Sequence, residues 1–289
     1  MRFKTKQKNT LVFITITIIC LFIFFTWQNN SITINNISFK NYSIPDGFNG
    51  YKILQISDLH NKEFGDNQDK LLYKIKKTNP DIIAVTGDLI DSNHTNTDAA
   101  MDLINKAIEI APIFYISGNH EAWSGSYSNL KSKLENSGVI VLDNEKTQIF
   151  KNDDSIDIIG LSDPSFNKSY SLGYSSGEEI GDLLNSITEN SNNFKILLAH
   201  RPELLHIYSN SNVDLVFSGH AHGGQVRLPF IGGLLAPDQG FFPKLTEGVH
   251  KDNNTSMVIS RGLGNSIIPI RIFNRPELIV VTLSKSINH

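Results

Sequence analysis

Two histidines separated by one residue stand in a glycine-rich stretch that follows an apolar run. His220 and His222 lie within residues 218–224, and the preceding run 213–217 is apolar enough to form a buried strand. Glycine lets the chain turn sharply after a strand, so both imidazoles can point toward one place. Neutral imidazole is the commonest metal ligand among side chains. Alone, the pair is equally typical of a solvated loop, so its meaning depends on the other strand ends.

Polar residues able to bind a metal ion also follow four other apolar runs. Each of these runs has the composition of a buried strand. The candidate metal ligands at the five strand ends are Asp58, His60, Asp88, Asn119, His200, His220 and His222. They offer only carboxylate, amide and imidazole donors, which suit Zn, Mn or Fe(II). The chain has one cysteine, Cys20, so an intramolecular disulfide and a thiolate cluster are both excluded.

Strand and helix patterns alternate through the region that carries the first of these ligands. Apolar runs predict strands over 53–57, 82–86 and 113–117, and amphipathic patterns predict helices over 66–77 and 98–110. This alternation is typical of an α/β sheet with adjacent strands. Ligands of such sheets bind beyond the carboxyl ends of the strands, which is where the candidate donors stand.

Similar patterns continue to the end of the chain. Helices are predicted over 127–136, 178–188 and 203–208, and strands over 139–142, 147–150, 156–161, 194–199, 213–217, 225–228, 257–260 and 278–283. A Ser-, Tyr- and Gly-rich stretch predicts a loop over 165–177, and a longer loop is predicted over 229–248. The patterns therefore predict one α/β domain.

The donor types indicate the chemistry that such a site can perform. One carboxylate, most naturally that of Asp88, can bridge two cations, and Asn119 offers a neutral oxygen. Two divalent ions about 3.5–4 Å apart can share a hydroxide and bind the attacking and leaving oxygens of a phosphoryl group. Water bound to such an ion has a pKa near 7, so the nucleophile exists at neutral pH.

The ordered motifs resemble those of the calcineurin-like metallophosphoesterases. The blocks that carry the resemblance are Asp58-Leu59-His60, Gly87-Asp88, Gly118-Asn119-His120-Glu121, His200 and Gly219-His220-Ala221-His222. The likeness extends over about residues 51–284, and all five blocks occur in order. The longer stretch 219–229 is similar to a bacterial subgroup of membrane-associated phosphodiesterases close to the UDP-2,3-diacylglucosamine hydrolases.

The resemblance implies a four-layer fold, a β-sandwich of two mixed sheets flanked by helices, where strand order alone suggests an open sheet. It also implies a binuclear centre with separate ligands for each metal: Asp58, His60 and His222 for one, and Asn119, His200 and His220 for the other. Asp88 would bridge the two ions. His120 would be the catalytic residue that faces the substrate, where it can stabilise the transition state or protonate the leaving oxygen.

Three arginines near the predicted strand ends are candidate substrate-binding residues. The guanidinium fork of Arg201, Arg227 or Arg261 matches the oxygens of a phosphate group. For each arginine the alternative is an ion pair within the fold.

An apolar loop over 229–242 follows the segment that carries His220 and His222. It can line a pocket for an acyl chain, touch a bilayer, or pack against the domain.

The N-terminus combines a basic segment with an uncharged apolar run. Residues 1–9 carry the basic side chains, and residues 10–27 would form a helix roughly 27 Å long, close to the thickness of a hydrocarbon core. Because no A-x-A-like cleavage site is evident and the large Ile19 precedes Cys20, we favour an uncleaved signal anchor over a signal peptide or a lipoprotein site. A buried core helix would have a polar face, which this run lacks.

The charge distribution around this run predicts a topology. Positive charge before the helix predicts a single-pass protein of the cell membrane with a cytoplasmic N-terminus and an extracytoplasmic catalytic domain. Residues 28–41 would form a linker, with a hint of an edge strand, and residues 42–289 the metallophosphoesterase domain.

Together these features predict a membrane-anchored, metal-dependent phosphoesterase that cleaves a phosphodiester or pyrophosphate bond, with a lipid-linked compound among the candidate substrates. The alternatives are a phosphomonoesterase or protein phosphatase, and a metal-binding module without catalysis. A formal net charge of −3 and the lack of a basic block in the body of the chain argue against nucleic acid as a partner. The sequence does not predict the oligomeric state.

Overall fold

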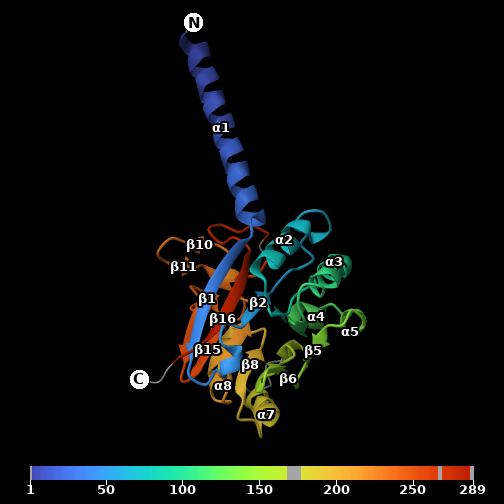
Figure 1. Cartoon of the computed structure of the whole chain (residues 1–289). Coiled ribbons are helices and arrows are strands. Elements are labelled where there is room, and N and C mark those ends of the chain that lie inside the picture. The colour runs from blue at the N-terminus through green and yellow to red at the C-terminus, as the bar shows by residue number, and fades with distance from the viewer. Residues whose placement is uncertain (1, 168–176, 266–268, 287–289) are drawn as a thin grey trace.

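Two six-stranded sheets dominate the computed structural model, which describes residues 2–167, 177–265 and 269–286 (Figure 1). The first sheet has the strand order β1 (Thr33–Asn41), β16 (Glu277–Lys285), β2 (Lys52–Ile56), β3 (Ile82–Thr86), β4 (Ile113–Ile116) and β5 (Ile140–Val141). The second has the order β14 (Gly248–Asp252), β15 (Thr255–Ile259), β9 (Leu215–Ser218), β8 (Phe194–Leu198), β7 (Asp154–Gly160) and β6 (Glu145–Lys151).

Both sheets are mixed. In the first, β2 to β5 are parallel and β16 runs antiparallel to β2. In the second, β7, β8, β9 and β15 are parallel, while β6 and β14 pair with them in the antiparallel sense. An open single sheet, which the strand order alone suggested, is therefore wrong, and the mixed β-sandwich is confirmed. The reason is that consecutive parallel strands look the same in sequence whether they lie in one sheet or two.

The core lies in three layers between and outside the sheets. Apolar side chains such as Ile53 and Phe217 pack between the two sheets. Because side chains of a strand alternate between its faces, the neighbour Leu54 packs instead against helices on the outer face of the first sheet. Strands buried on both faces read as continuous apolar runs, which is why they were visible in the sequence.

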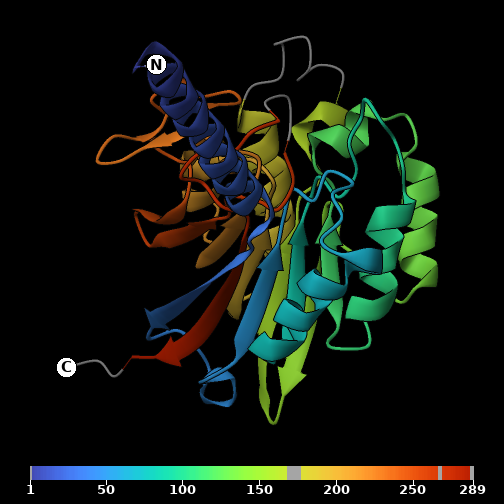
Figure 2. The ribbon, with the colours of Figure 1, turned by 90° about the horizontal axis from the view of Figure 1, so that it is seen from above.

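Helices cover both outer faces, so the four-layer α/β arrangement is confirmed. The helices α2 (Asp69–Thr78), α3 (Asp98–Ala107) and α5 (Tyr127–Asn136) share a core with the first sheet. The helices α7 (Gly177–Thr188) and α8 (Leu205–Ser209) pack on the second sheet. Figure 2, which views the molecule from above, shows α2, α3 and α5 on one side of the sandwich.

The N-terminal helix α1 (Arg2–Asn30) projects from the domain (Figure 1). Its segment Lys6–Asn30 is long and apolar enough to cross a membrane, and its most apolar part is not buried against the domain. The chain then enters the sheet directly, since β1 begins three residues after the helix ends. The expected linker over 28–41 therefore consists of the helix end and an edge strand, and the folded domain begins at β1 rather than at residue 42.

The other predicted elements are found within a few residues of their expected positions. The short strand β10 (Arg227–Leu228) lies within the strand predicted over 225–228. Elements that the sequence patterns did not predict are α4 (Asn119–Trp123), β14, and the short strands β11 (Gly232–Gly233), β12 (Leu235–Ala236) and β13 (Gly240–Phe241). The last three lie in the segment predicted as a long loop. Most of the loop predicted over 165–177, namely 168–176, falls outside the described residues.

Candidate metal centre

The carboxyl ends of five parallel strands converge between the two sheets. Strands β2, β3 and β4 of the first sheet and β8 and β9 of the second end at the same side of the sandwich. Two hydrogen bonds join the sheets there: Gln55 Nε2 donates to the Ser218 carbonyl over 2.8 Å, and His200 Nδ1 lies 2.7 Å from the Thr86 carbonyl. The seven predicted ligands follow these strand ends and lie in one buried cluster.

Four of the seven side chains form a first group. The donor atoms of Asp58, His60, Asp88 and His222 all lie within 4.8 Å of one another. His60 Nε2 is 3.1 Å from His222 Nε2 and 3.6 Å from Asp88 Oδ2, and His222 Nε2 is 3.4 Å from Asp58 Oδ1. Two ligands bound about 2.1 Å from one metal ion are roughly 3.0–3.4 Å apart, so this spacing suits a shared cation.

A second group meets the first at Asp88. Asp88, His200 and His220 offer donor atoms within 4.8 Å of one another. His200 Nε2 lies 3.2 Å from Asp88 Oδ2 and 3.1 Å from Asn119 Oδ1. The peptide oxygen of Thr86 fixes the proton on Nδ1 of His200 and leaves Nε2 facing these oxygens, a common arrangement behind a metal-bound histidine. Asp88 is therefore the only one of the seven that belongs to both groups of donors.

The backbone at the cluster is strained. Five of the seven residues have positive φ angles in the left-handed region: Asp58 (52°), His60 (48°), Asp88 (53°), His220 (63°) and His222 (47°). Such a conformation costs a residue with a side chain about 1–2 kcal/mol. Backbone hydrogen bonds hold it in place, including those from the His60 and Asp58 amides to the carbonyls of Asp88 and Gly87. Strain concentrated in this way is typical of functional sites.

Two glycines leave room for the carboxylates. A Cβ atom on Gly118 would lie 2.3 Å from Asp88 Oδ1, and one on Gly219 would lie 2.4 Å from Asp58 Oδ2. Neither glycine has a positive φ, so close approach rather than backbone freedom requires glycine at these positions.

Burial sets the protonation of the histidines. It lowers the pKa of His60 to about 3 and that of His222 well below its usual value, so both rings are neutral, the form that binds metal. His200 differs, because although burial disfavours its charge, the Asp88 carboxylate raises its pKa to about 10. A proton between His200 and Asp88 thus occupies the place in the charge balance that a cation would take. The donors and their charges fit a divalent metal.

His120 lies beside the cluster on α4, the short helix that also carries Asn119. Its ring packs edge-on against that of His60, with centroids 4.5 Å apart, and is nearly buried. The amide of Ser92 donates to Nδ1 over 3.1 Å, and the Asp91 carboxylate lies 3.7 Å from the same nitrogen. Sequence reasoning missed Asp91, although its position three residues after Asp88 in Gly87–Asp91 was a usable signal.

Glu121 is a second residue that sequence reasoning did not assign. Its carboxylate accepts hydrogen bonds from the amides of Asp88 over 2.8 Å and Gly118 over 2.7 Å. Burial raises its pKa to about 8. Glu121 therefore joins the turn after β3 to the start of α4 and holds two ligand-bearing segments in register.

The three candidate arginines all have carboxylate partners. Arg201 Nε lies 2.8 Å from Asp163 Oδ2, Arg261 Nη2 lies 2.8 Å from Glu277 Oε2, and Arg227 pairs with Glu247. Arg201 is also connected to the cluster, because Asp238 lies 2.6 Å from its Nη1 and 3.0 Å from His220 Nε2. These contacts match the alternative of ion pairs within the fold, and substrate binding by the arginines stays a prediction.

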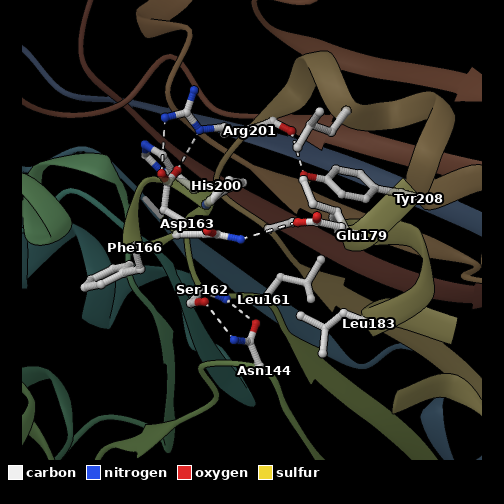
Figure 3. Close-up of a pocket in the computed structure, with 15 residues that line it drawn as sticks. Asn144, Leu161, Ser162, Asp163, Phe166, Glu179, Leu183, His200, Arg201 and Tyr208 are labelled. Carbon is white, nitrogen blue, oxygen red and sulfur yellow. Dashed lines mark hydrogen bonds and ion pairs between the residues drawn. The ribbon is translucent and has the colours of Figure 1, made fainter. Parts of the chain in front are cut away.

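A cavity of about 290 Å³ adjoins His200 on the side of the second sheet (Figure 3). Leu161 and Leu183 form part of its apolar wall. Its polar groups contact one another: Arg201 binds Asp163, and Tyr208 Oη donates to the Arg201 carbonyl over 2.9 Å. The cavity therefore adjoins the metal-binding cluster at His200 and, among the described residues, does not contain a second site of its own.

Comparison with known proteins gives one consistent family. The model of the calcineurin-like phosphoesterases matches residues 51–224. The metallophosphoesterase YkuE of Bacillus subtilis is 33% identical over 252 residues, which cover 86% of this chain and 84% of YkuE. The metallophosphoesterase Cj0846 of Campylobacter jejuni is 29% identical, covering 93% of this chain and 69% of that protein. The phosphodiesterase YaeI of Escherichia coli is 27% identical, with coverage of 85% and 84%.

The matched region contains every residue of the buried His/Asp cluster, from Asp58 to His222. The chain therefore belongs to the calcineurin-like phosphoesterase family, as a metal-dependent phosphoester hydrolase.

Proposed function

We propose that this protein is a membrane-anchored phosphodiesterase that cleaves a phosphodiester or pyrophosphate bond at a binuclear metal centre. The observation that carries the proposal is the convergence of seven donors in two groups that share Asp88. In this assignment Asp88 bridges the two metal ions, and each remaining group supplies three ligands: Asp58, His60 and His222 for one, and Asn119, His200 and His220 for the other. Zn, Mn and Fe(II) all suit these donors.

The cations would supply a nucleophile from water at neutral pH and neutralise charge on the phosphoryl oxygens. The remaining chemistry falls to His120. Because the Ser92 amide donates to Nδ1, the proton of the neutral ring stands on Nε2. That N–H can donate a hydrogen bond to the leaving oxygen and stabilise its developing negative charge, which an alcohol leaving group needs more than an acidic phenol does.

Two observations support a phosphodiester over a monoester. YaeI, which aligns over most of this chain, is named a phosphodiesterase. A phosphomonoester carries one more negative charge than a phosphodiester. Each of the three candidate arginines already forms an ion pair with a carboxylate, so none of them offers an unpaired positive charge to balance it. A phosphomonoesterase is the alternative.

The membrane part of the proposal is supported by α1. Its length and composition suit a membrane-spanning helix, and the basic residues at its start favour a cytoplasmic N-terminus with the catalytic domain outside. A lipid-linked phosphoester follows as the substrate class, of which the nucleotide–lipid substrates implied by the likeness of 219–229 are one example.

The test compares two model esters with the full-length protein in detergent micelles. We expect bis-p-nitrophenyl phosphate to be cleaved faster than p-nitrophenyl phosphate with Mn or Zn, and no cleavage with a chelator. Asp88→Asn should lower the diester rate more than about 100-fold. Replacing a residue that hydrogen-bonds to a metal ligand typically costs about 10–100-fold, and replacing a ligand shared by two metal ions should cost more. Asp153→Asn, at an exposed carboxylate, is the matched control.

Each other outcome has a definite meaning. Full diester activity in Asp88→Asn contradicts the binuclear assignment. Cleavage of the monoester alone favours the phosphomonoesterase. Metal binding with no cleavage of either ester favours a metal-binding module.

A further inference from the structure

A group of large apolar side chains lies exposed on the segments that follow His222. This apolar patch consists of Leu228, Phe230, Ile231, Phe241, Phe242 and Phe273. Phe230 is fully exposed, and the exposed fractions of Phe241 and Phe242 are 78% and 62%. Single exposed apolar residues are ordinary, but several exposed aromatics on neighbouring segments usually mark a surface that contacts something else.

The backbone of the patch is an independent sign of function. Phe230, Phe242 and Phe273 have φ angles of 68°, 54° and 50°, a region that bulky side chains rarely adopt. Glycine or asparagine would relieve this strain, and an exposed aromatic ring contributes little to the stability of the fold. For Phe230 and Phe242, which are the more exposed of the three, the strained backbone therefore points to a contact outside the chain.

The patch is continuous with the membrane helix. The ring of Phe273 packs edge-on against that of Phe24 in α1, with centroids 5.7 Å apart, and Phe273 lines one groove together with the turn between β10 and β11. Figures 1 and 2 both show β10 and β11 beside the base of α1. The base is fixed to the domain, since Asn29 Oδ1 accepts from the Arg271 amide over 3.0 Å and Arg275 stacks 4.5 Å over the ring of Trp27.

We infer that the apolar patch inserts into the headgroup region of the same bilayer that α1 spans, so that its partner is a lipid surface. This inference rests on the proposed anchoring by α1. Aromatic and branched apolar side chains are the types that settle at a membrane interface. A helix that leaves the domain beside the patch brings the bilayer to it without any further binding partner.

The segment that carries the patch also contacts the metal centre. The Leu234 amide donates to the Gly224 carbonyl over 3.2 Å, directly after His222, and Asp238 lies 3.0 Å from His220 Nε2. The start of β1 is level with the end of β2, since Thr33 pairs with Glu277 and Gln55 with Ile279, so the base of α1 and the cluster share one end of the sandwich. The centre thus faces the lipid–water boundary, where the phosphoesters are those of lipid headgroups.

The test uses quenching of a fluorescent label by lipids that carry a nitroxide group on their acyl chains. The full-length protein has one cysteine, Cys20, which is exposed on α1. Three single-cysteine proteins are labelled and reconstituted into phosphatidylcholine–phosphatidylglycerol vesicles: the native protein, Cys20→Ser with Phe230→Cys, and Cys20→Ser with Phe150→Cys. Phe150 is a matched control, because it is 70% exposed but lies on β6 at the opposite end of the sandwich from the cluster.

We expect at least a twofold greater loss of fluorescence at position 230 than at position 150. Equal quenching at the two positions overturns the inference, as does a blue-shifted but unquenched label at 230, which would show that a second protein surface covers the patch. The label on Cys20 separates the two proposals. Quenching at 20 without quenching at 230 leaves the anchor standing and removes only the inference, whereas no quenching at 20 removes the anchor itself.

Discussion

Two segments that are adjacent in the chain use strained backbone in opposite ways. In residues 218–224, His220 and His222 have positive φ angles and are 3% and 2% exposed. In residues 225–242, Phe230 and Phe242 also have positive φ angles but are exposed. Hydrogen bonds from buried groups hold the first pair: the His220 amide donates to Asp58 Oδ1 over 3.0 Å, and Asn274 Nδ2 donates to the His222 carbonyl over 2.7 Å.

The burial of the strained histidines and the exposure of the strained aromatics indicate where each segment binds its partner. The histidines are fixed before any ligand arrives, because a metal centre needs its donors in place. Phe230 and Phe242 are instead exposed, as the inferred contact with a lipid surface requires. The predictions below test this contrast.

The largest effect is expected when a donor is removed from the buried segment. His222→Ala should abolish metal-dependent cleavage of bis-p-nitrophenyl phosphate and lower the amount of metal that copurifies with the protein. The reason is that His222 Nε2 belongs to the group of four donors around Asp58. His206→Ala, at an exposed histidine that lies 3.3 Å from Asp252 at the surface, should leave both quantities unchanged. Equal metal content in His222→Ala and His206→Ala would contradict the assignment of His222 as a ligand.

A second change separates the role of the His120 N–H from metal binding. His120→Ala should lower kcat about 10²–10³-fold for a diester with an alcohol leaving group, the usual cost of losing one hydrogen-bond donor to the developing charge, and by less for bis-p-nitrophenyl phosphate, whose leaving group is an acidic phenol. Metal content should stay at the native level, because the donor atom of His120 is grouped with those of His60 and Asp91 and belongs to neither of the two groups that contain Asp88. Loss of metal together with activity would make His120 a ligand and remove the proposed hydrogen-bond donor.

The seven donors could be predicted because each follows a strand that is buried on both faces. Such strands read as unbroken apolar runs, and the polar residue types after them stand out. The helix α4 was missed for a physical reason: a helix of five residues is too short to show a 3.6-residue period, so Asn119 and His120 appeared to lie in a loop.

The arginine contacts and the short hairpins could not be predicted, because distant residues decide them. Arg201 binds Asp163, 38 residues away in the chain. Strands β10 to β13 have two residues each, and their positions depend on the contact between Gly224 and Gly233, where a Cβ atom on Gly224 would lie 2.4 Å from the Gly233 Cα. The local sequence in this segment shows only glycines and aromatics, which suit several turns.

A smaller effect tests the close packing around Asp88. Gly118→Ala should lower the free energy of unfolding by about 1–3 kcal/mol, because the added methyl group meets Asp88 Oδ1 and the Asp88 amide. Gly181→Ala, inside α7, is the matched control. Its Cβ atom would make only an ordinary contact of 3.6 Å with Ile207, and the change should raise stability by about 0.5–1 kcal/mol. Urea unfolding of both variants, followed by circular dichroism, checks the two signs. A neutral or stabilising Gly118→Ala would show that the cluster is looser than its hydrogen bonds indicate.

The smallest effect bears most directly on the contrast between the two segments. Phe230→Asn should raise the free energy of unfolding by about 0.5–1 kcal/mol, because asparagine tolerates the left-handed conformation and the fully exposed ring makes little packing to lose. Phe150→Asn, on a regular strand, should lower it slightly, since asparagine is disfavoured in strands. Urea unfolding of chains that lack residues 1–27 allows the comparison in water without a micelle over the patch. If Phe230→Asn were destabilising, the ring would contribute to the stability of the fold. Contacts within the chain would then hold the strained backbone at Phe230, as they do at the buried histidines.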